Sequence, residues 1–199
     1  MKNFFYIMGK SATGKDTVYK ELKKKIKIGS YLLYTTRPIR KGEKEGVDYY
    51  FISNEQMETY RKQNKIIEIR MYNTMQGIWK YATIEDKQFE QAEDILTVGT
   101  LQSYQSMRDY FQKNKKWNLK PIYIEITEEE RRRRAIERES KQEKPDFKEL
   151  ERRLKVDNID FSEEKIQKVG IEPRQRFENN DLETCVKQIQ NYMEEESKR

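Results

Sequence analysis

A glycine-rich stretch near the start of the chain, MGKSATGKDT at residues 8–17, contains the residue types that hold phosphate. Gly9, Gly14 and Lys15 have the spacing G-x-x-x-x-G-K, and Asp16 follows where Ser or Thr is usual. Glycine lets the backbone wrap closely around a phosphate, the amides at a helix start point toward it, and the lysine reaches the terminal phosphates. The stretch therefore predicts a loop that binds a nucleoside triphosphate, formed by Gly9, Ser11, Ala12, Thr13, Gly14, Lys15, Asp16 and Thr17.

Asp16 has two interpretations. An acidic residue is favourable in the first turn of a helix, because the helix N-terminus carries a partial positive charge. A carboxylate at this place is also a hard oxygen ligand for the Mg²⁺ that accompanies a nucleotide, and the adjacent Thr17 supplies a hydroxyl. The residues leave both interpretations open, and Asp16 and Thr17 are the predicted metal ligands.

Two arginines form a second candidate anion site. Arg37 and Arg40 flank Pro38, which rules out a regular helix there and favours an extended turn. Two guanidinium forks on one turn suit a single phosphate. Two solvated arginines would have the same spacing, so the spacing alone does not decide between a binding site and a solvated turn.

Composition limits the classes of protein to consider. The chain has 199 residues, which suits one ordinary domain, and 41 basic against 35 acidic residues give a net charge of +6. This charge fits an anionic ligand, but the basic residues are interleaved with acidic ones, which argues against a nucleic-acid-binding stripe. Histidine is absent and Cys185 is the single cysteine, which excludes imidazole chemistry and an internal disulfide. The apolar run FFYIM is too short to span a bilayer, so we expect a cytoplasmic protein without membrane contact.

Alternating strands and helices must position these residues. Residues 3–8 are a continuous apolar run, typical of a buried parallel strand, and Val18, Leu22 and Ile26 then recur at helical spacing. This order predicts an α/β fold, a parallel sheet flanked by helices, with a small mixed insertion after residue 35. Further strands are expected at 31–34, 47–52, 65–71, 94–100 and 121–127, and further helices at 54–63, 84–92, 101–113, 128–140, 146–156 and 181–196.

The second anion site belongs to a longer pattern. The chain holds, in order, Thr35-Thr36-Arg37, Arg40, Gly42-Glu43, Gly46, Asp48-Tyr49 and Phe51. This resembles the monophosphate-binding signature of the guanylate kinases, T-T-R-x-x-R-x-G-E-x-x-G-x-D-Y-x-F, and the phosphate loop precedes it at a suitable distance. The resemblance implies a P-loop core (1–34, 94–130 and 158–199), a GMP-binding insertion (35–93) and a helical lid (131–157).

The resemblance also implies roles for single residues of the insertion. In that family the two arginines and the tyrosine of the signature hold the GMP phosphate, and these are Arg37, Arg40 and Tyr49 here. Glu68 takes the place of a glutamate that binds the guanine edge, although a glutamate on the solvent face of a strand would fit the same pattern. The segment from Tyr81 to Thr83 is similar to the Tyr-Gly-Ser/Thr of the family, in which the tyrosine contacts phosphate and the last residue contacts guanine O6.

The lid and the end of the chain match the family in kind. Arg134 and Arg138, on one helical face, and Arg153 resemble arginines with which the family clamps ATP and the transferring phosphoryl group. With Lys15, they are the expected catalytic residues. Asn179 resembles a late residue close to the adenine of ATP.

Two positions depart from the family pattern. Leu33 stands in place of a serine, and Gly99 or Thr100 stands in place of an aspartate that follows the third core strand. Thr100 remains a predicted GMP-site residue, but a guanine 2-amino group would lose a charged acceptor there. The nucleotide preference is therefore open.

These observations predict Mg²⁺-dependent transfer of the γ-phosphoryl group of ATP to a nucleoside monophosphate, with GMP or dGMP preferred, by a monomer or homodimer. No general base is needed, because the acceptor phosphate is already an anion, so positioning and charge neutralisation carry the reaction. Two alternatives stay open. One is a related kinase for another nucleotide or a phosphorylated ribose, and the other is a guanylate-kinase-like binding module that has lost catalysis.

Overall fold

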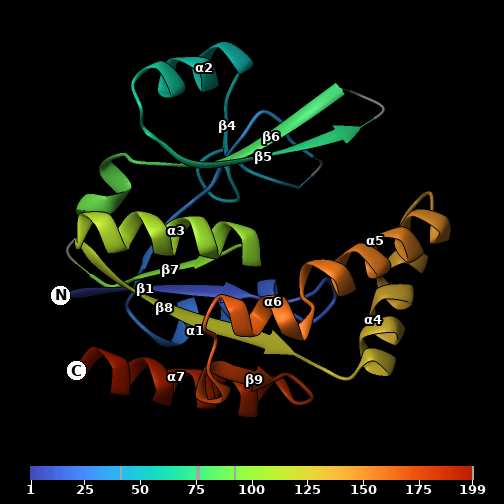
Figure 1. Cartoon of the computed structure of the whole chain (residues 1–199). Coiled ribbons are helices and arrows are strands. Elements are labelled where there is room, and N and C mark those ends of the chain that lie inside the picture. Colours follow the sequence, from blue (N-terminus) through green and yellow to red (C-terminus); the bar gives the residue numbers. More distant parts are fainter. Residues whose placement is uncertain (41, 75–76, 92, 199) are drawn as a thin grey trace.

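A parallel sheet of five strands forms the centre of the molecule. The computed structural model describes residues 1–40, 42–74, 77–91 and 93–198. The strand order is β2-β7-β1-β8-β9, and all neighbouring strands are parallel (Figure 1). The strands are Lys2–Met8 (β1), Gly29–Ser30 (β2), Ile95–Val98 (β7), Trp117–Glu125 (β8) and Arg176–Glu178 (β9).

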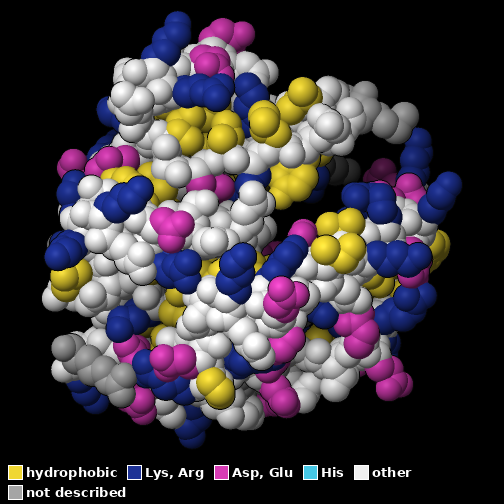
Figure 2. Space-filling model, viewed as in Figure 1, with side chains coloured by type: hydrophobic (Ala, Val, Ile, Leu, Met, Phe, Trp, Pro, Cys, Tyr) yellow, Lys and Arg dark blue, Asp and Glu magenta, His cyan; other side chains and the backbone are white. Residues whose placement is uncertain are grey.

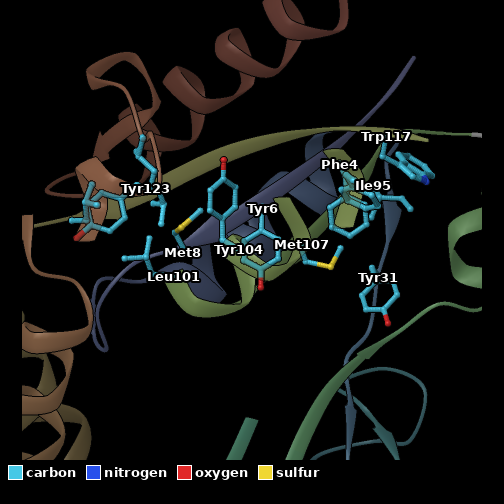
Figure 3. Close-up of a cluster of buried hydrophobic side chains, with 14 of the residues drawn as sticks. Phe4, Tyr6, Met8, Tyr31, Ile95, Leu101, Tyr104, Met107, Trp117 and Tyr123 are labelled. Carbon is cyan, nitrogen blue, oxygen red and sulfur yellow. The ribbon is translucent and has the colours of Figure 1, made fainter. Parts of the chain in front are cut away.

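Helices cover both faces of this sheet, which explains why β1 is apolar throughout. Phe4, Tyr6 and Met8 pack on the side of α3 and α6, in the cluster that Figure 3 shows. Phe5 and Ile7 point to the opposite side, against α1 and α7. A strand buried on both faces needs apolar residues at every position rather than at alternate ones. The covering helices are Lys15–Lys25 (α1), Leu101–Asn114 (α3), Glu163–Lys168 (α6) and Leu182–Lys198 (α7).

A smaller mixed sheet lies above the core in Figure 1. Its order is β4-β3-β6-β5, with β3 parallel to β4 and antiparallel to β6. Its helix α2 begins after Ser53, whose hydroxyl accepts the backbone N–H of Gln56 while the Gln56 side chain returns to the Ser53 N–H. The elements are Tyr34–Thr35 (β3), Tyr50–Phe51 (β4), Asn54–Lys62 (α2), Ile66–Thr74 (β5) and Gly77–Ile84 (β6).

Two helices stand to the side of the core, α4 (Glu128–Ser140) and α5 (Phe147–Asp160) (Figure 1). They pack on each other through Ala135, Leu150 and Leu154, and Ala12 of the glycine-rich loop joins this contact. Figure 2 shows the surface hollowed between these helices and the small sheet. The α/β fold with a parallel sheet core is thus confirmed. No helix in the described ranges is both long and apolar enough to cross a membrane.

The helices predicted at 54–63, 101–113 and 128–140 are confirmed as α2, α3 and α4, each within one residue at its ends. The helix predicted at 84–92 is wrong. Ile84 ends β6, and only a single 3₁₀ turn, η1 (Lys87–Glu90), follows it. Residue 92 lies outside the described residues. The Asp86 side chain accepts the Gln88 N–H and holds this short turn instead.

The strand predicted at 31–34 is wrong as a single element. The chain leaves the core sheet after β2 and enters the small sheet at β3, and Tyr31 between them anchors the crossing. Its hydroxyl donates to the Ile84 carbonyl and accepts the Ile84 N–H at 2.9 and 2.7 Å. The strand predicted at 47–52 shrinks to β4, because the Val47 and Asp48 amides close turns onto the Lys44 carbonyl.

Strand β6 was missed, because no element was predicted between the strand at 65–71 and the helix at 84–92. The strand forms a hairpin with β5, but Met71, Tyr72 and Ile78 are exposed at its far end. A hairpin that leaves its apolar residues exposed lacks the alternation that predicts a half-buried strand. Strand β8 begins four positions before the predicted residue 121, and α6 and β9 were not predicted.

Candidate active site

The glycine-rich loop joins β1 to α1 and needs its glycines for steric reasons. Gly14 has φ 91°, and a Cβ there would lie 2.3 Å from Nδ2 of Asn179. A Cβ on Gly9 would lie 2.3 Å from the carbonyl oxygen of Ile124. The loop therefore approaches two other segments more closely than any side chain allows. This is the strand–loop–helix context that the motif requires.

Lys15 folds over the loop. Its Nζ donates to the Lys10 carbonyl at 2.7 Å, and the side chain is half-buried. Burial lowers the pKa of Lys15 to about 8, and the positive charge of Arg138 acts in the same direction. The negative charges of Asp16 and Asp157 oppose this shift. Burial therefore disfavours the charged form of Lys15, and the negative charge of a phosphate that enters the loop would favour it again.

Asp16 and Thr17 lie exposed in the first turn of α1. Burial raises the pKa of Tyr49, next to Tyr81, and the charge of Asp16 adds to this effect. Asp16 is thus within electrostatic reach of the second anion site. Among the described residues, no three His, Cys, Asp or Glu side chains form a metal-binding group. One carboxylate beside a phosphate loop fits Mg²⁺, which takes much of its coordination from nucleotide phosphates and water.

The second anion site is built around Arg37, whose side chain is 2% exposed. Its Nη1 and Nη2 donate to the two carboxylate oxygens of Glu43 at 2.9 and 2.8 Å. Its Nε donates to the Tyr81 hydroxyl at 2.9 Å, and its guanidinium carbon lies 5.4 Å from the centre of the Tyr49 ring. The hydrogen bond from Arg37 lowers the pKa of Glu43. Three predicted residues and the signature glutamate therefore meet in one prearranged cluster.

Arg40 is placed differently from Arg37. Its backbone N–H donates to Glu43 at 2.8 Å, so the turn is tied to the same carboxylate. Its guanidinium is exposed and lies 5.9 Å from the centre of the Trp79 ring. Arg40 is therefore an exposed cation at the rim of the cluster, and its predicted contact with the acceptor phosphate stays a prediction.

Glu68 and Thr83 lie opposite each other on β5 and β6, on the inner side of the small sheet. The Glu68 side chain is 4% exposed, so the interpretation that places it on a solvent face is wrong. Its Oε1 accepts the Thr83 hydroxyl at 2.9 Å, and its Oε2 accepts Nε of Arg70 at 3.2 Å. Nη1 of Arg70 reaches the Thr100 hydroxyl at 3.3 Å. The predicted base-site residues thus form one connected group, and Arg70 is its unpredicted member.

Tyr6 explains why no acidic side chain stands at residue 99. A Cβ on Gly99 would lie 1.9 Å from the Tyr6 hydroxyl oxygen, so the phenol occupies the space of any side chain there. Thr100 is the next residue, and it accepts the Ser103 N–H as the N-cap of α3. The end of β7 therefore presents a neutral hydroxyl to the small sheet.

The lid arginines divide into two kinds. Arg134 reaches the loop region, where its Nη2 donates to the Asn179 carbonyl at 3.0 Å, and Asn179 in turn donates to the Thr13 carbonyl at 2.8 Å. Arg138 is exposed and has no hydrogen bond or ion pair within the described ranges, although its charge acts on Lys15. Arg153 instead donates to the buried Glu139 at 2.9 Å, inside the lid.

Two residues of α4 and α5, Arg131 and Asp157, were missed from the sequence. Arg131 is 1% exposed and binds Glu128 at 2.5 Å, Asn158 at 2.9 Å and Asp157 at 3.4 Å. Oδ2 of Asp157 accepts the backbone N–H of Ser11 at 2.7 Å. A carboxylate of α5 therefore sits on an amide of the phosphate loop. The only signal for Arg131 was its position one helical turn before the buried Ala135, within a run of four arginines.

The glycine-rich loop between β1 and α1 defines a P-loop fold, and the small sheet adds a cluster of side chains around the buried Arg37. The chain belongs to the guanylate kinase family, because the family model described as "Guanylate kinase" matches residues 1–196. The recognition made from the sequence is thus confirmed.

Individual relatives are similar over different lengths. The chain is 41% identical over 83 residues to a guanylate kinase of Rhodopirellula baltica and 36% identical over 106 residues to one of Clostridium tetani. These alignments span 41% and 52% of this chain, and only 39% and 51% of the two relatives. A guanylate kinase of Fusobacterium nucleatum is 28% identical over 166 residues, which are 80% of this chain and 88% of that protein.

A solved structure supports the fold. The crystal structure of guanylate kinase from Anaplasma phagocytophilum matches with a TM-score of 0.65 at 22% sequence identity. The match covers 98% of this chain and 86% of that one. At this identity the likeness concerns the arrangement of helices and strands, not the chemistry of the site.

Proposed function

We propose that this chain transfers the γ-phosphoryl group of ATP to the phosphate of a nucleoside monophosphate, with GMP or dGMP as the acceptor. The observation that carries the proposal is the presence of two separate cation sites in one fold. Lys15 lies on the glycine-rich loop and Arg37 in the small sheet beside Tyr49, whose pKa is raised in part by the charge of Asp16, the neighbour of Lys15. Family membership supports the same reaction.

Lys15 and the loop amides bind the donor phosphates in this proposal, and Arg37 and Tyr81 orient the acceptor phosphate. Because the acceptor oxygen is already anionic, the chain needs to align the reactants and neutralise charge, and it needs no base. Asp16 and Thr17 would hold Mg²⁺, which when bound neutralises charge on the donor phosphates. A metal contact by Asp16 stays a proposal.

The lid arginines are proposed to close over the donor. Arg134 already reaches the loop, and the guanidinium of Arg138 is available for an incoming phosphate. Arg153, held by Glu139, orients the second lid helix in this scheme. Closure would exclude water and so limit hydrolysis of ATP. Asn179 at the loop is proposed to lie beside the adenine.

We also propose the division into a core (1–34, 94–130 and 158–199), an acceptor insertion (35–93) and a lid (131–157). The separate hydrophobic cluster of the small sheet and that of α4 and α5 support it. The location in the cytoplasm and the monomeric or dimeric state stay predictions. A catalytically inactive module is disfavoured, because loop, lysine and lid arginines are all present. Because residue 99 lacks the acidic acceptor expected for guanine, the test also includes other nucleotides.

An assay of ADP formation tests the proposal. ATP and Mg²⁺ are offered with GMP, dGMP, AMP, UMP, CMP or ribose bisphosphate, and we expect the largest rate with GMP or dGMP. The Lys15→Ala variant is the control for contaminating kinases and should form no ADP. Absence of ADP with every acceptor would overturn the proposed reaction.

A further inference from the structure

Arg70 is a buried cation that the proposed reaction does not explain. Its side chain is 8% exposed and lies between the small sheet and the start of α3. Its Nε and Nη1 bind Glu68 and Thr100, whereas its Nη2 is buried and has no partner among the residues that the structure describes. A buried donor without an acceptor destabilises a folded protein. Such a donor in a binding site therefore indicates an acceptor atom on the ligand.

The position of Arg70 places that acceptor atom in the acceptor-nucleotide site. Arg70 lies opposite Tyr81 in the β5–β6 register, and Tyr81 holds Arg37 at the proposed phosphate end. Glu68 is two residues along the same strand, on the same face, opposite Thr83. Along this row, starting from the proposed phosphate end, a bound ligand would meet first the Arg70 guanidinium and then the Glu68 carboxylate.

Both side chains keep unused capacity for a ligand. A carboxylate accepts about four hydrogen bonds, and Glu68 receives one from Thr83 and one from Arg70. Arg70 has five N–H groups, of which two are used. A carboxylate next to a guanidinium matches a ring N–H next to a carbonyl oxygen, because the acceptor faces the donor in both pairs.

We propose that Arg70 reads the base of the acceptor nucleotide by donating Nη2–H to a carbonyl oxygen beside the ring N–H that Glu68 accepts. This inference rests on the proposed function and names its substrate class. Guanine, hypoxanthine and xanthine have an N–H next to a carbonyl, whereas adenine and cytosine have an unprotonated ring nitrogen next to an amino group. With adenine, Arg70 would face a donor and Glu68 a lone pair, so both buried groups would be left unpaired.

The same site makes little demand on the 2-amino group of guanine. Thr83 and Thr100, which flank the Glu68–Arg70 pair, offer only neutral hydroxyls. A neutral hydrogen bond discriminates by about tenfold at most, whereas unpaired buried polar groups discriminate by about 10⁴-fold. We therefore expect IMP and XMP to be used within about tenfold of GMP, and AMP to be rejected.

Two measurements on Arg70→Met test this role. The first is kcat/KM for GMP, IMP, XMP and AMP with saturating ATP. The second is the affinity for GMP and AMP without ATP, by calorimetry, which requires no phosphoryl transfer. We expect the variant to lose about 100-fold in kcat/KM for each oxopurine nucleotide, mainly through KM, with no loss for AMP. Arg61→Met is the matched control, because Arg61 is an exposed arginine of α2 in the same insertion.

If the Arg70→Met variant does not fold, Arg70→Lys is measured instead, because it keeps the positive charge. The lysine lacks the planar fork and should recover only part of the preference for oxopurines. If the GMP-to-AMP ratio of either folded variant stays within threefold of the parent, Arg70 does not read the base. If oxopurine nucleotides bind in an Arg70-dependent manner but no ADP forms, the base-reading role holds and the proposed reaction fails.

Discussion

The proposed acceptor site and the proposed donor site hold their cations in opposite ways. In the acceptor site, Arg37 is buried and its three donor nitrogens already have partners, chiefly both oxygens of Glu43 and the Tyr81 hydroxyl. In the donor site, Lys15 rests on a backbone carbonyl and Arg138 has no partner among the described residues. An amide of the donor loop is bound by a carboxylate of the lid rather than left open.

This difference shows that one site orients its side chains before a ligand binds, whereas the other must rearrange them when the ligand binds. The Arg37 cluster is assembled by the protein, so a phosphate meets side chains that are already oriented. The donor site has to exchange partners, because a triphosphate must replace the Lys10 carbonyl at Lys15 and meet the charge of Asp157. We therefore expect acceptor-site variants to change stability and acceptor affinity together, and donor-site variants to change catalysis with little change in stability.

Loss of the loop lysine should have the largest effect. Lys15→Ala removes the cation that is proposed to neutralise the transferring phosphoryl group, and we expect turnover to fall by about 10³-fold or more. The thermal midpoint should change little, because Lys15 has no ion pair in the described structure. Lys20→Ala, an exposed lysine of the same helix, is the control. A Lys15→Ala variant with near-parental turnover contradicts the donor-site assignment.

Loss of Arg37 should rank second and should separate the two sites. Arg37→Ala leaves the Glu43 carboxylate without its main partner, which costs about 3 kcal/mol in the free energy of unfolding. The KM for the acceptor should rise by about 100-fold and the KM for ATP should stay near the parental value. Steady-state kinetics measures the two KM values, and urea unfolding measures the free energy of unfolding. Arg40→Ala, which removes an exposed guanidinium, should change stability far less.

The pH dependence of ATP use tests the lowered pKa of Lys15. Burial holds the pKa of Lys15 at about 8, below its ordinary value of 10.5, so the folded chain loses this proton before the unfolded chain does. Between these pH values the contribution of Lys15 to the free energy of unfolding rises with pH, but the ammonium that is proposed to bind ATP disappears. We expect kcat/KM for ATP to fall by about fivefold between pH 8 and pH 9, as the protonated fraction of Lys15 falls. In Lys15→Arg this fall should move above pH 10, and an unchanged profile would count against Lys15 as its source.

Asp157 should give the smallest effect. Asp157→Asn keeps an oxygen to accept the Ser11 N–H but removes a negative charge beside the loop. The carboxylate repels triphosphate, so ATP should bind about threefold to tenfold more tightly in the variant, and less so at high salt. Asp160→Asn, an exposed residue of the same helix, is the control. Weaker ATP binding by Asp157→Asn at low salt would contradict this view of the donor site.

Short-range sequence patterns predicted the elements that carry the proposed phosphate sites. The loop glycines, Lys15 and the arginine turn have spacings that follow from local backbone geometry. The α2–α4 helices were equally visible through their periodicity and caps. The hairpin strand β6 was not, because its outer end leaves Tyr72 and Ile78 exposed and so shows no alternation.

The sequence by itself determined the class of protein, the loop that must wrap a phosphate and the arginine turn of the second site, because these depend on neighbouring residues. Only the tertiary structure decided which arginines are engaged and by what. Glu43 orients Arg37, Tyr6 excludes a side chain at Gly99, and Asp157 reaches Ser11. Arg70 of β5 reaches Thr100 at the start of α3. All of these contacts except Glu43–Arg37 join residues far apart in the chain, and the burial that strengthens each contact exists only after the elements have packed.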